Sequence, residues 1–226
     1  YQPEKVLDAF FARLKEFANF ITLKPADHGL WQFHLLNRLL YALSGAKLKK
    51  ELAEETGLSV STVGSYLRLA KDLHLVEATN SKKYQLADLG KKYVWSRDIN
   101  APVEFISDEQ SRTLQDFIIK DPFVSRTVFG IYTMVETVFT LSKNTYPVPL
   151  DMVIDYFRKS SGKYFEWSTD KAITDGTKMY SNYATELGLV GRIGDKFYIT
   201  PDGIRFVLLL QLHKAIKMVD ALGISR

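Results

Sequence analysis

The sequence contains no cysteine among its 226 residues, and it has no long hydrophobic run. The first absence excludes disulfide bonds, thiolate metal sites and a cysteine nucleophile. No apolar stretch reaches the roughly 18 residues that a membrane-spanning helix needs, and no secretory signal peptide is visible. We therefore expect a cytoplasmic protein that does not partner a membrane. Residue 1 is tyrosine rather than methionine, as expected for part of a longer protein.

Motifs of common catalytic sites are also missing. The four histidines (His28, His34, His74 and His213) do not pair with each other or with carboxylates at metal-ligand spacing. The glycine patterns of phosphate-binding and dinucleotide-binding loops and the nucleophile elbow are absent. Pro201-Asp202 lacks the downstream carboxylate-x-Lys of a restriction-nuclease metal site. We expect no enzyme activity, cofactor or metal in this chain, although a longer protein could carry a catalytic domain.

Charge is unevenly distributed along the chain. The formal net charge is +4, from 30 basic and 26 acidic residues. Residues 47–97 contain ten basic and six acidic side chains, whereas residues 147–207 contain eight of each. Because neutralisation of phosphates supplies non-specific affinity for nucleic acids, residues 47–97 are the better candidate for a primary contact with DNA.

The stretch from Leu48 to Val94 predicts two helices, a tight turn between them and a hairpin. Gly57 follows the last periodic residue of the first helix, where a left-handed residue is common. Ser59 can cap the second helix with its side-chain oxygen. That helix has a buried stripe at spacings of three and four residues, formed by Val63, Leu67, Ala70 and Leu73. Short apolar-polar runs at 76–78 and 84–86 then predict the hairpin.

The pattern of Ala53, Gly57 and Val63 resembles the bacterial and archaeal helix-turn-helix family. The ending of this stretch, where a strand closes as Tyr84-x-Leu86 before a helix containing Gly90, resembles the wing of winged-helix regulators. The resemblance covers this one module, and it implies that the second helix enters a DNA major groove. Winged helices also serve as protein-interaction modules, so a scaffold without DNA binding remains an alternative.

Other elements are expected from hydrophobic periodicity and caps. The capping box Ser107-x-x-Gln110 predicts a helix start, and Gly194-Asp195 predicts a hairpin turn. The remaining helices are expected at 4–20, 30–43, 89–95, 122–141, 150–157, 169–187 and 203–219, and the second hairpin at 189–200. The helices at 4–20 and 203–219 could each form a homodimer or close the core.

The chain also repeats itself. Leu69–Glu77 aligns with Tyr183–Gly191 at a shift of 114, and Tyr84–Val94 aligns with Phe197–Val207 at a shift of 113. The second copy departs at residues 161–167, which replace the short turn at Gly57. We therefore expect a mainly α fold with small β-hairpin wings, built as two winged-helix modules in tandem. The expected domains are 1–98, with an N-terminal helix and the first module, and 99–226, with the second module and a C-terminal helix.

The helix-turn-helix resemblance implies a set of DNA contacts. Arg68 has the chemistry to pair bidentately with guanine, and the lysines suit phosphates. The contacts expected in the first module are Lys47, Lys49, Lys50, Ser59, Ser61, Thr62, Gly64, Ser65, Arg68, Lys82 and Lys83. Those expected in the second are Lys171, Thr174, Lys178, Asn182, Arg192 and Lys196, although Asp170 and Asp175 lie among them.

Each assignment has a structural alternative. The lysines at 82 and 83 also suit a solvated turn, and Arg68 could pair with Asp72 one helical turn later for about 0.3 kcal/mol. The aromatic residues of the 161–167 insertion could stack on bases or ligands, although aromatic clusters usually pack in cores.

The leading hypothesis is sequence-specific binding of double-stranded DNA. Such a protein would act with the nucleoid, as a transcription regulator or as the recognition part of a larger DNA-processing protein. Tandem winged helices also resemble the DNA-recognition regions of some restriction endonucleases. Alternatives are the interaction scaffold and a ligand-sensing regulator with a pocket beneath residues 124–141.

Overall fold

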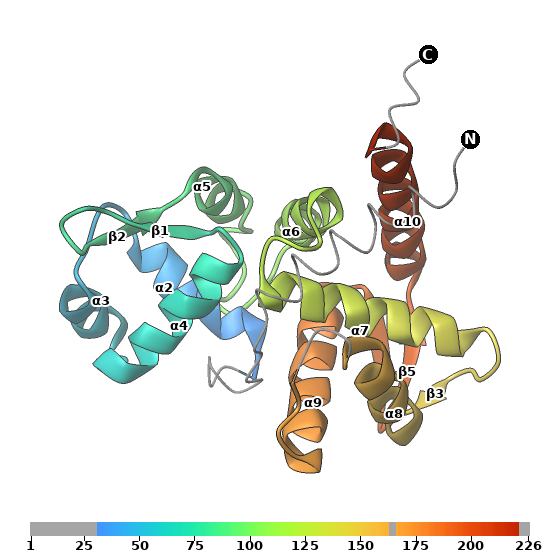
Figure 1. The fold of residues 1–226 in the computed structure, drawn as a ribbon. Helices are drawn as coiled ribbons and strands as arrows, with labels where there is room; N and C mark the ends of the chain where they lie inside the picture. Colours follow the sequence, from blue (N-terminus) through green and yellow to red (C-terminus); the bar gives the residue numbers. More distant parts are fainter. Residues whose placement is uncertain (1–30, 163–165, 222–226) are drawn as a thin grey trace.

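A computed structural model of the chain describes residues 31–162 and 166–221 (Figure 1). The predicted helix at 4–20 and residues 163–165 of the insertion lie outside this part. The described chain is mainly helical with two small antiparallel sheets, as expected for the fold class. None of its helices combines the length and apolar character needed to cross a bilayer.

In the described part of the N-terminal half, a 3₁₀ helix, η1 (Phe33–Leu35), leads into α2 (Leu36–Ala42). The helix predicted at 30–43 is therefore shorter than expected. The next elements are α3 (Lys49–Thr56), α4 (Val60–Asp72), β1 (Val76–Ala78), β2 (Tyr84–Leu86) and α5 (Asp88–Trp95). Gly57 ends α3 with φ at +70°, and the Ser59 hydroxyl accepts a hydrogen bond from the Thr62 amide at 3.1 Å. Both predicted caps are confirmed.

The C-terminal half contains a similar series after the linking helix α6 (Asp108–Lys120). It consists of α7 (Arg126–Ser142), β3 (Val148–Pro149), α8 (Leu150–Ser161), α9 (Asp170–Glu186), β4 (Val190–Ile193), β5 (Lys196–Ile199) and α10 (Pro201–Ala221). The capping box at Ser107 and Gln110 is confirmed. The prediction that a helix starts near Pro122 was wrong: the Ser125 hydroxyl accepts a hydrogen bond from the Val128 amide, so α7 begins at Arg126.

Turns at equivalent positions of the two halves have the same conformation. His74 and Gly188, 114 residues apart, follow α4 and α9 with positive φ angles of 55° and 71°. The next residue in each half, Leu75 or Leu189, donates a backbone hydrogen bond to the carbonyl of Ala70 or Ala184. The sequence repeat therefore corresponds to repeated local structure at the end of both helices.

The hairpins repeat their surroundings too. An isolated antiparallel bridge joins Lys47 to Tyr84, and in the C-terminal half β3 pairs with β5 through Val148 and Phe197. Tyr84 and Phe197 are 113 residues apart. In each half, a third segment thus pairs with the hairpin: Lys47, before α3, in the first half, and β3, before α8, in the second.

The two halves hold one another through carboxylates at the ends of α4 and α9. A carboxylate oxygen of Asp72 accepts a hydrogen bond from the Thr127 hydroxyl of α7 at 2.8 Å. Glu186 accepts hydrogen bonds from the backbone amides of Phe33 and His34 at 3.0 and 2.7 Å. Each acid therefore contacts the opposite half, Asp72 at α7 and Glu186 at η1.

Helix α6 links the same regions and lies between α5 and α10 (Figure 1). The Gln115 amide donates to the Leu187 carbonyl after α9 at 2.9 Å, and the Phe117 ring lies 5.3 Å from the His74 ring after α4. Helix α6 thus contacts the turns that follow both α4 and α9.

The burial of two tyrosines leads us to expect that the free energy of unfolding depends on pH. Burial raises the pKa values of the Tyr93 and Tyr183 phenols above the ordinary value of 10.0. Below about pH 10 both phenols are protonated in the folded and unfolded chains, so stability does not change. Above it only the unfolded chain loses these protons, and the free energy of unfolding should fall by up to about 1.4 kcal/mol per pH unit for each group.

Urea unfolding at pH 9, 10 and 11 measures this effect. Tyr183→Phe should make the fall above pH 10 shallower, because the variant has one titrating phenol fewer. Equal free energies of unfolding at pH 9 and pH 11 would contradict the burial of these groups.

Candidate nucleic-acid interface

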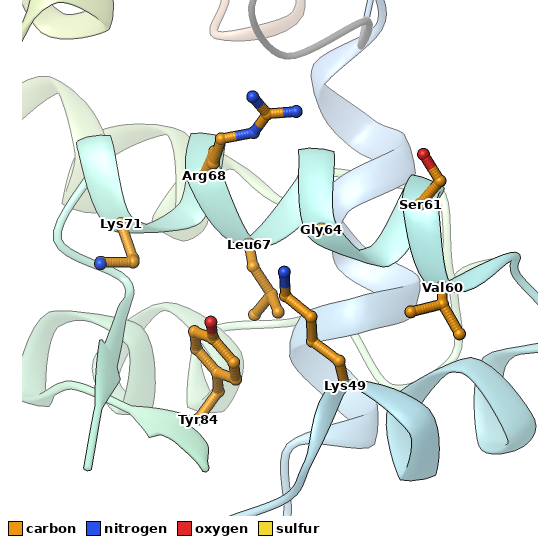
Figure 2. A pocket seen from close by; sticks show the side chains of 8 residues that line it. All are labelled: Lys49, Val60, Ser61, Gly64, Leu67, Arg68, Lys71 and Tyr84. Carbon is orange, nitrogen blue, oxygen red and sulfur yellow. The ribbon is translucent and has the colours of Figure 1, made fainter. Parts of the chain in front are cut away.

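An open groove runs along α4, bounded by the start of α3 and by β2 (Figure 2). Its volume is about 540 Å³. The residues that line it are Lys49, Val60, Ser61, Gly64, Leu67, Arg68, Lys71 and Tyr84. Three of these side chains are cationic and none is a carboxylate. The groove therefore has the charge of an anion-binding surface.

Helix α4 buries an apolar stripe and leaves its other side to the groove, and Leu67, at the edge of the stripe, also lines the groove. Val63, Leu67 and Ala70 are each no more than 1% exposed, as their spacing predicted. On the outer side, Val60 is 46% exposed, and Ser61 and Arg68 are also exposed. Ser61 and Arg68 extend from the flank of α4 opposite Lys49 and Tyr84 (Figure 2). Polar side chains therefore lie on both sides of α4, with Lys49 from α3 and Tyr84 from β2 on one side.

The lysines before and within α3 differ in their partners. Lys47 donates a hydrogen bond to the Ala42 carbonyl at 2.6 Å and forms an ion pair with Glu55. Its expected contact with DNA would compete with these bonds. Lys49 has no ion pair or hydrogen bond within residues 31–162 and 166–221, and Lys50 is exposed. The charge of Lys49 is therefore available to a ligand in the groove.

Arg68 does not use Asp72 as its partner. Its guanidinium donates to the Ser65 hydroxyl at 3.3 Å, while Asp72 accepts from Thr127. Ser59 and Thr62, both expected to contact DNA, share a hydrogen bond of 2.8 Å at the start of α4. Their hydroxyls serve the helix cap, whereas Ser61, Arg68 and Lys71 extend into solvent.

The hairpin β1–β2 holds its lysines at the tip. The Thr79 amide donates to the Lys83 carbonyl at 2.8 Å, and the Lys82 amide donates to the Thr79 carbonyl at 3.1 Å. Lys82 has a positive φ of 59° and an exposed side chain, while Lys83 is half-buried. These bonds order the backbone of the tip and leave the Lys82 ammonium in solvent.

Three of the six expected contacts of the C-terminal half bind other groups of the protein. Asn182 donates a side-chain hydrogen bond to the Trp31 carbonyl at 3.1 Å, and Thr174 donates to the Asp170 carbonyl at 2.9 Å. Arg192 donates to the Gly194 carbonyl and pairs with Asp195. Lys171, Lys178 and Lys196 are exposed. Asp170, which precedes Lys171, pairs with Arg158 at 2.8 Å.

Two polar residues of the groove, Lys71 and Tyr84, were not among the expected contacts. Lys71 lies three residues after Arg68 on α4, and its spacing alone would have placed it beside that residue. Tyr84 was assigned to a strand, but the flank it faces depends on the pairing of β2 with the segment at Lys47. Within the described part of the chain, no three potential metal ligands lie together.

Comparison of the chain with models of protein families, with curated proteins and with solved structures finds no match. The geometry and charge of the groove are therefore the evidence from which a function is inferred.

Proposed function

We propose that this chain binds double-stranded DNA, with α4 as the helix that enters the major groove and β1–β2 as the wing. The observation that carries the proposal is the groove along α4, lined by Lys49, Arg68 and Lys71 without a carboxylate. Phosphate neutralisation by such side chains provides affinity, and contacts to base edges provide specificity.

The order of elements supports a winged-helix module. Three helical segments, a hairpin and a closing helix follow one another between Phe33 and Trp95, and the bridge at Lys47 gives the hairpin its third segment. The same order and the same turn contacts recur 113 to 114 residues later, which favours two such modules in tandem.

The shape of α4 favours duplex DNA over duplex RNA. Its 13 residues span about 20 Å, and its outer face contains the small residues Ser61 and Ser65. The major groove of B-form DNA, about 12 Å wide, admits a helix, whereas the major groove of A-form RNA is too narrow for side chains to read. Small residues allow the helix backbone to approach the bases closely.

We assign the C-terminal half a supporting role. Its Glu186 and Asn182 bind the backbone of Trp31, Phe33 and His34 and thereby position the first half. The module would act within a transcription regulator or as the recognition part of a larger DNA-processing protein.

Selection from randomised duplexes across a series of salt concentrations tests the proposal. For the parent chain we expect an enriched motif. Arg68→Ala should relax one position of that motif, a loss of about 1–3 kcal/mol of discrimination. The Lys82→Ala/Lys83→Ala double variant should weaken all duplexes and reduce the salt slope by about two.

Arg112→Ala is the control, because Arg112 is an exposed cation of α6 outside the groove. It should change neither the motif nor the salt slope. If folded protein retained no duplex at about 0.1 M salt, the proposal would be wrong and the interaction scaffold would be the better interpretation.

A further inference from the structure

Gly64 lies in the middle of α4, where glycine is unfavourable for the helix by about 1 kcal/mol relative to alanine. Its backbone is helical, so the position does not require a positive φ. A β-carbon at Gly64 would meet the Lys49 side chain, with Nζ at 3.3 Å and Cε at 3.8 Å. The missing side chain therefore gives room to a lysine that comes from another helix.

Lys49 is the first residue of α3, and its side chain extends toward α4 (Figure 2). The ammonium lies beside Gly64 and Leu67, and Tyr84 and Lys71 lie farther along the same flank (Figure 2). Within the described residues, neither lysine makes an ion pair. The ammonium groups of Lys49 and Lys71 and the Tyr84 hydroxyl thus border this flank of the groove.

We propose that this flank of the groove is a phosphodiester-binding site, in which Lys49, Lys71 and Tyr84 hold a backbone phosphate of one DNA strand. The inference rests on the proposed function and adds to it which side of α4 faces a phosphate of the DNA backbone. Arg68 and Ser61, on the opposite flank of α4, then address the base edges. Gly64 is a positioning residue, because it allows the Lys49 ammonium to lie against α4.

The chemistry of the flank selects this ligand. Lysine ammonium groups act as point charges toward phosphate, and a tyrosine hydroxyl can donate a hydrogen bond to a phosphate oxygen. The absence of a carboxylate from the lining residues disfavours a cation. A volume of about 540 Å³ open to solvent accommodates a phosphate with its flanking sugars.

Gly64→Ala separates positioning from folding. The methyl group would lie 3.3 Å from Lys49 Nζ, so this flexible side chain has to shift by a few tenths of an ångström, and the affinity for the selected duplex should fall about twofold. Thermal stability should not fall, because alanine favours the helix. Lys49→Ala removes the ammonium and should lower affinity about tenfold, with a salt slope smaller by about one. The double variant should lose no more than Lys49→Ala alone, since both changes act on the same contact. Gly45→Ala, where a β-carbon meets no atom within 4 Å, is the control.

Duplexes with a single neutral methylphosphonate linkage locate the contact. At one linkage, the substitution should weaken binding by the parent chain about tenfold and have little effect on Lys49→Ala. Tyr84→Phe should weaken binding of the unmodified duplex by a smaller factor. A mononucleotide phosphate that competes as strongly as the duplex would overturn the assignment to the DNA backbone.

Failure of this inference is distinguishable from failure of the proposed function. If the parent chain selects duplexes but Lys49→Ala and Gly64→Ala bind them with unchanged affinity and salt slope, the phosphate site is wrong and DNA binding stands. If the folded parent chain binds no duplex, both proposals are overturned.

Discussion

Replacing Gly90 with alanine is expected to lower the free energy of unfolding by about 3 kcal/mol. A β-carbon at this position of α5 would lie 1.9 Å from the backbone oxygen of Leu75. That carbonyl accepts the Ala87 amide at 3.0 Å, so it cannot move without loss of the bond that closes the hairpin onto α4. Gly203→Ala should be comparably destabilising, because its β-carbon would lie 2.0 Å from the Leu189 oxygen.

Urea unfolding of the two variants measures the effect. Gly45→Ala should stay within about 0.5 kcal/mol of the parent chain, since the space around Gly45 is open. If Gly90→Ala unfolded at the urea concentration of the parent chain, the close approach of α5 to Leu75 would be contradicted.

Replacing Asn37 with leucine is expected to cost about 3 kcal/mol, because three polar groups lose their partner. Asn37 is fully buried on α2. Its amide nitrogen donates to the carbonyls of Val103 and Phe105 at 3.0 and 3.1 Å, and its oxygen accepts from the Tyr93 hydroxyl at 2.8 Å. One side chain thus joins α2 to α5 and to the connection before α6.

A double-mutant cycle isolates the bond to Tyr93. In an Asn37→Leu background, Tyr93→Phe should cost less than it costs in the parent chain, because the hydroxyl has already lost its acceptor. Additive losses of free energy would show that this bond contributes little. Amide hydrogen exchange of Phe105 should also become faster in Asn37→Leu, since the segment loses two bonds to α2 and its own amide bond to the Pro102 carbonyl can open more often.

Local signals in the sequence were sufficient for much of the fold. Gly57 and Ser59 predicted the turn between α3 and α4, because a left-handed residue and a side-chain cap act on their immediate neighbours. The burial of Val63 and Leu67 followed from helical spacing. The start of α7 was misplaced because Pro122 and Ser125 are both plausible starts, and only the hydrogen bond to Val128 distinguishes them.

The candidate site was less predictable, since the availability of a charged side chain depends on tertiary partners. Lys47 and Lys49 are two lysines in the same short stretch of sequence. Lys47 forms an ion pair with Glu55, whereas the Lys49 side chain lies beside Gly64 of α4. Asn182 is bound by Trp31, 151 residues away in the chain, which no local pattern indicates. The role of Gly64 likewise depends on a lysine from another helix.

The reciprocal contacts of Asp72 and Glu186 have a consequence for evolution as well as for assembly. If the two halves were separate copies of one protein, these contacts would dissociate on dilution. A mutation would also change both copies at once. Here both contacts lie within a single chain, so the placement of α4 relative to α9 does not depend on protein concentration. Each half has its own sequence, so the two helices differ in their polar residues: Arg68 and Lys71 of α4 are exposed, whereas Asn182 of α9 binds the Trp31 carbonyl.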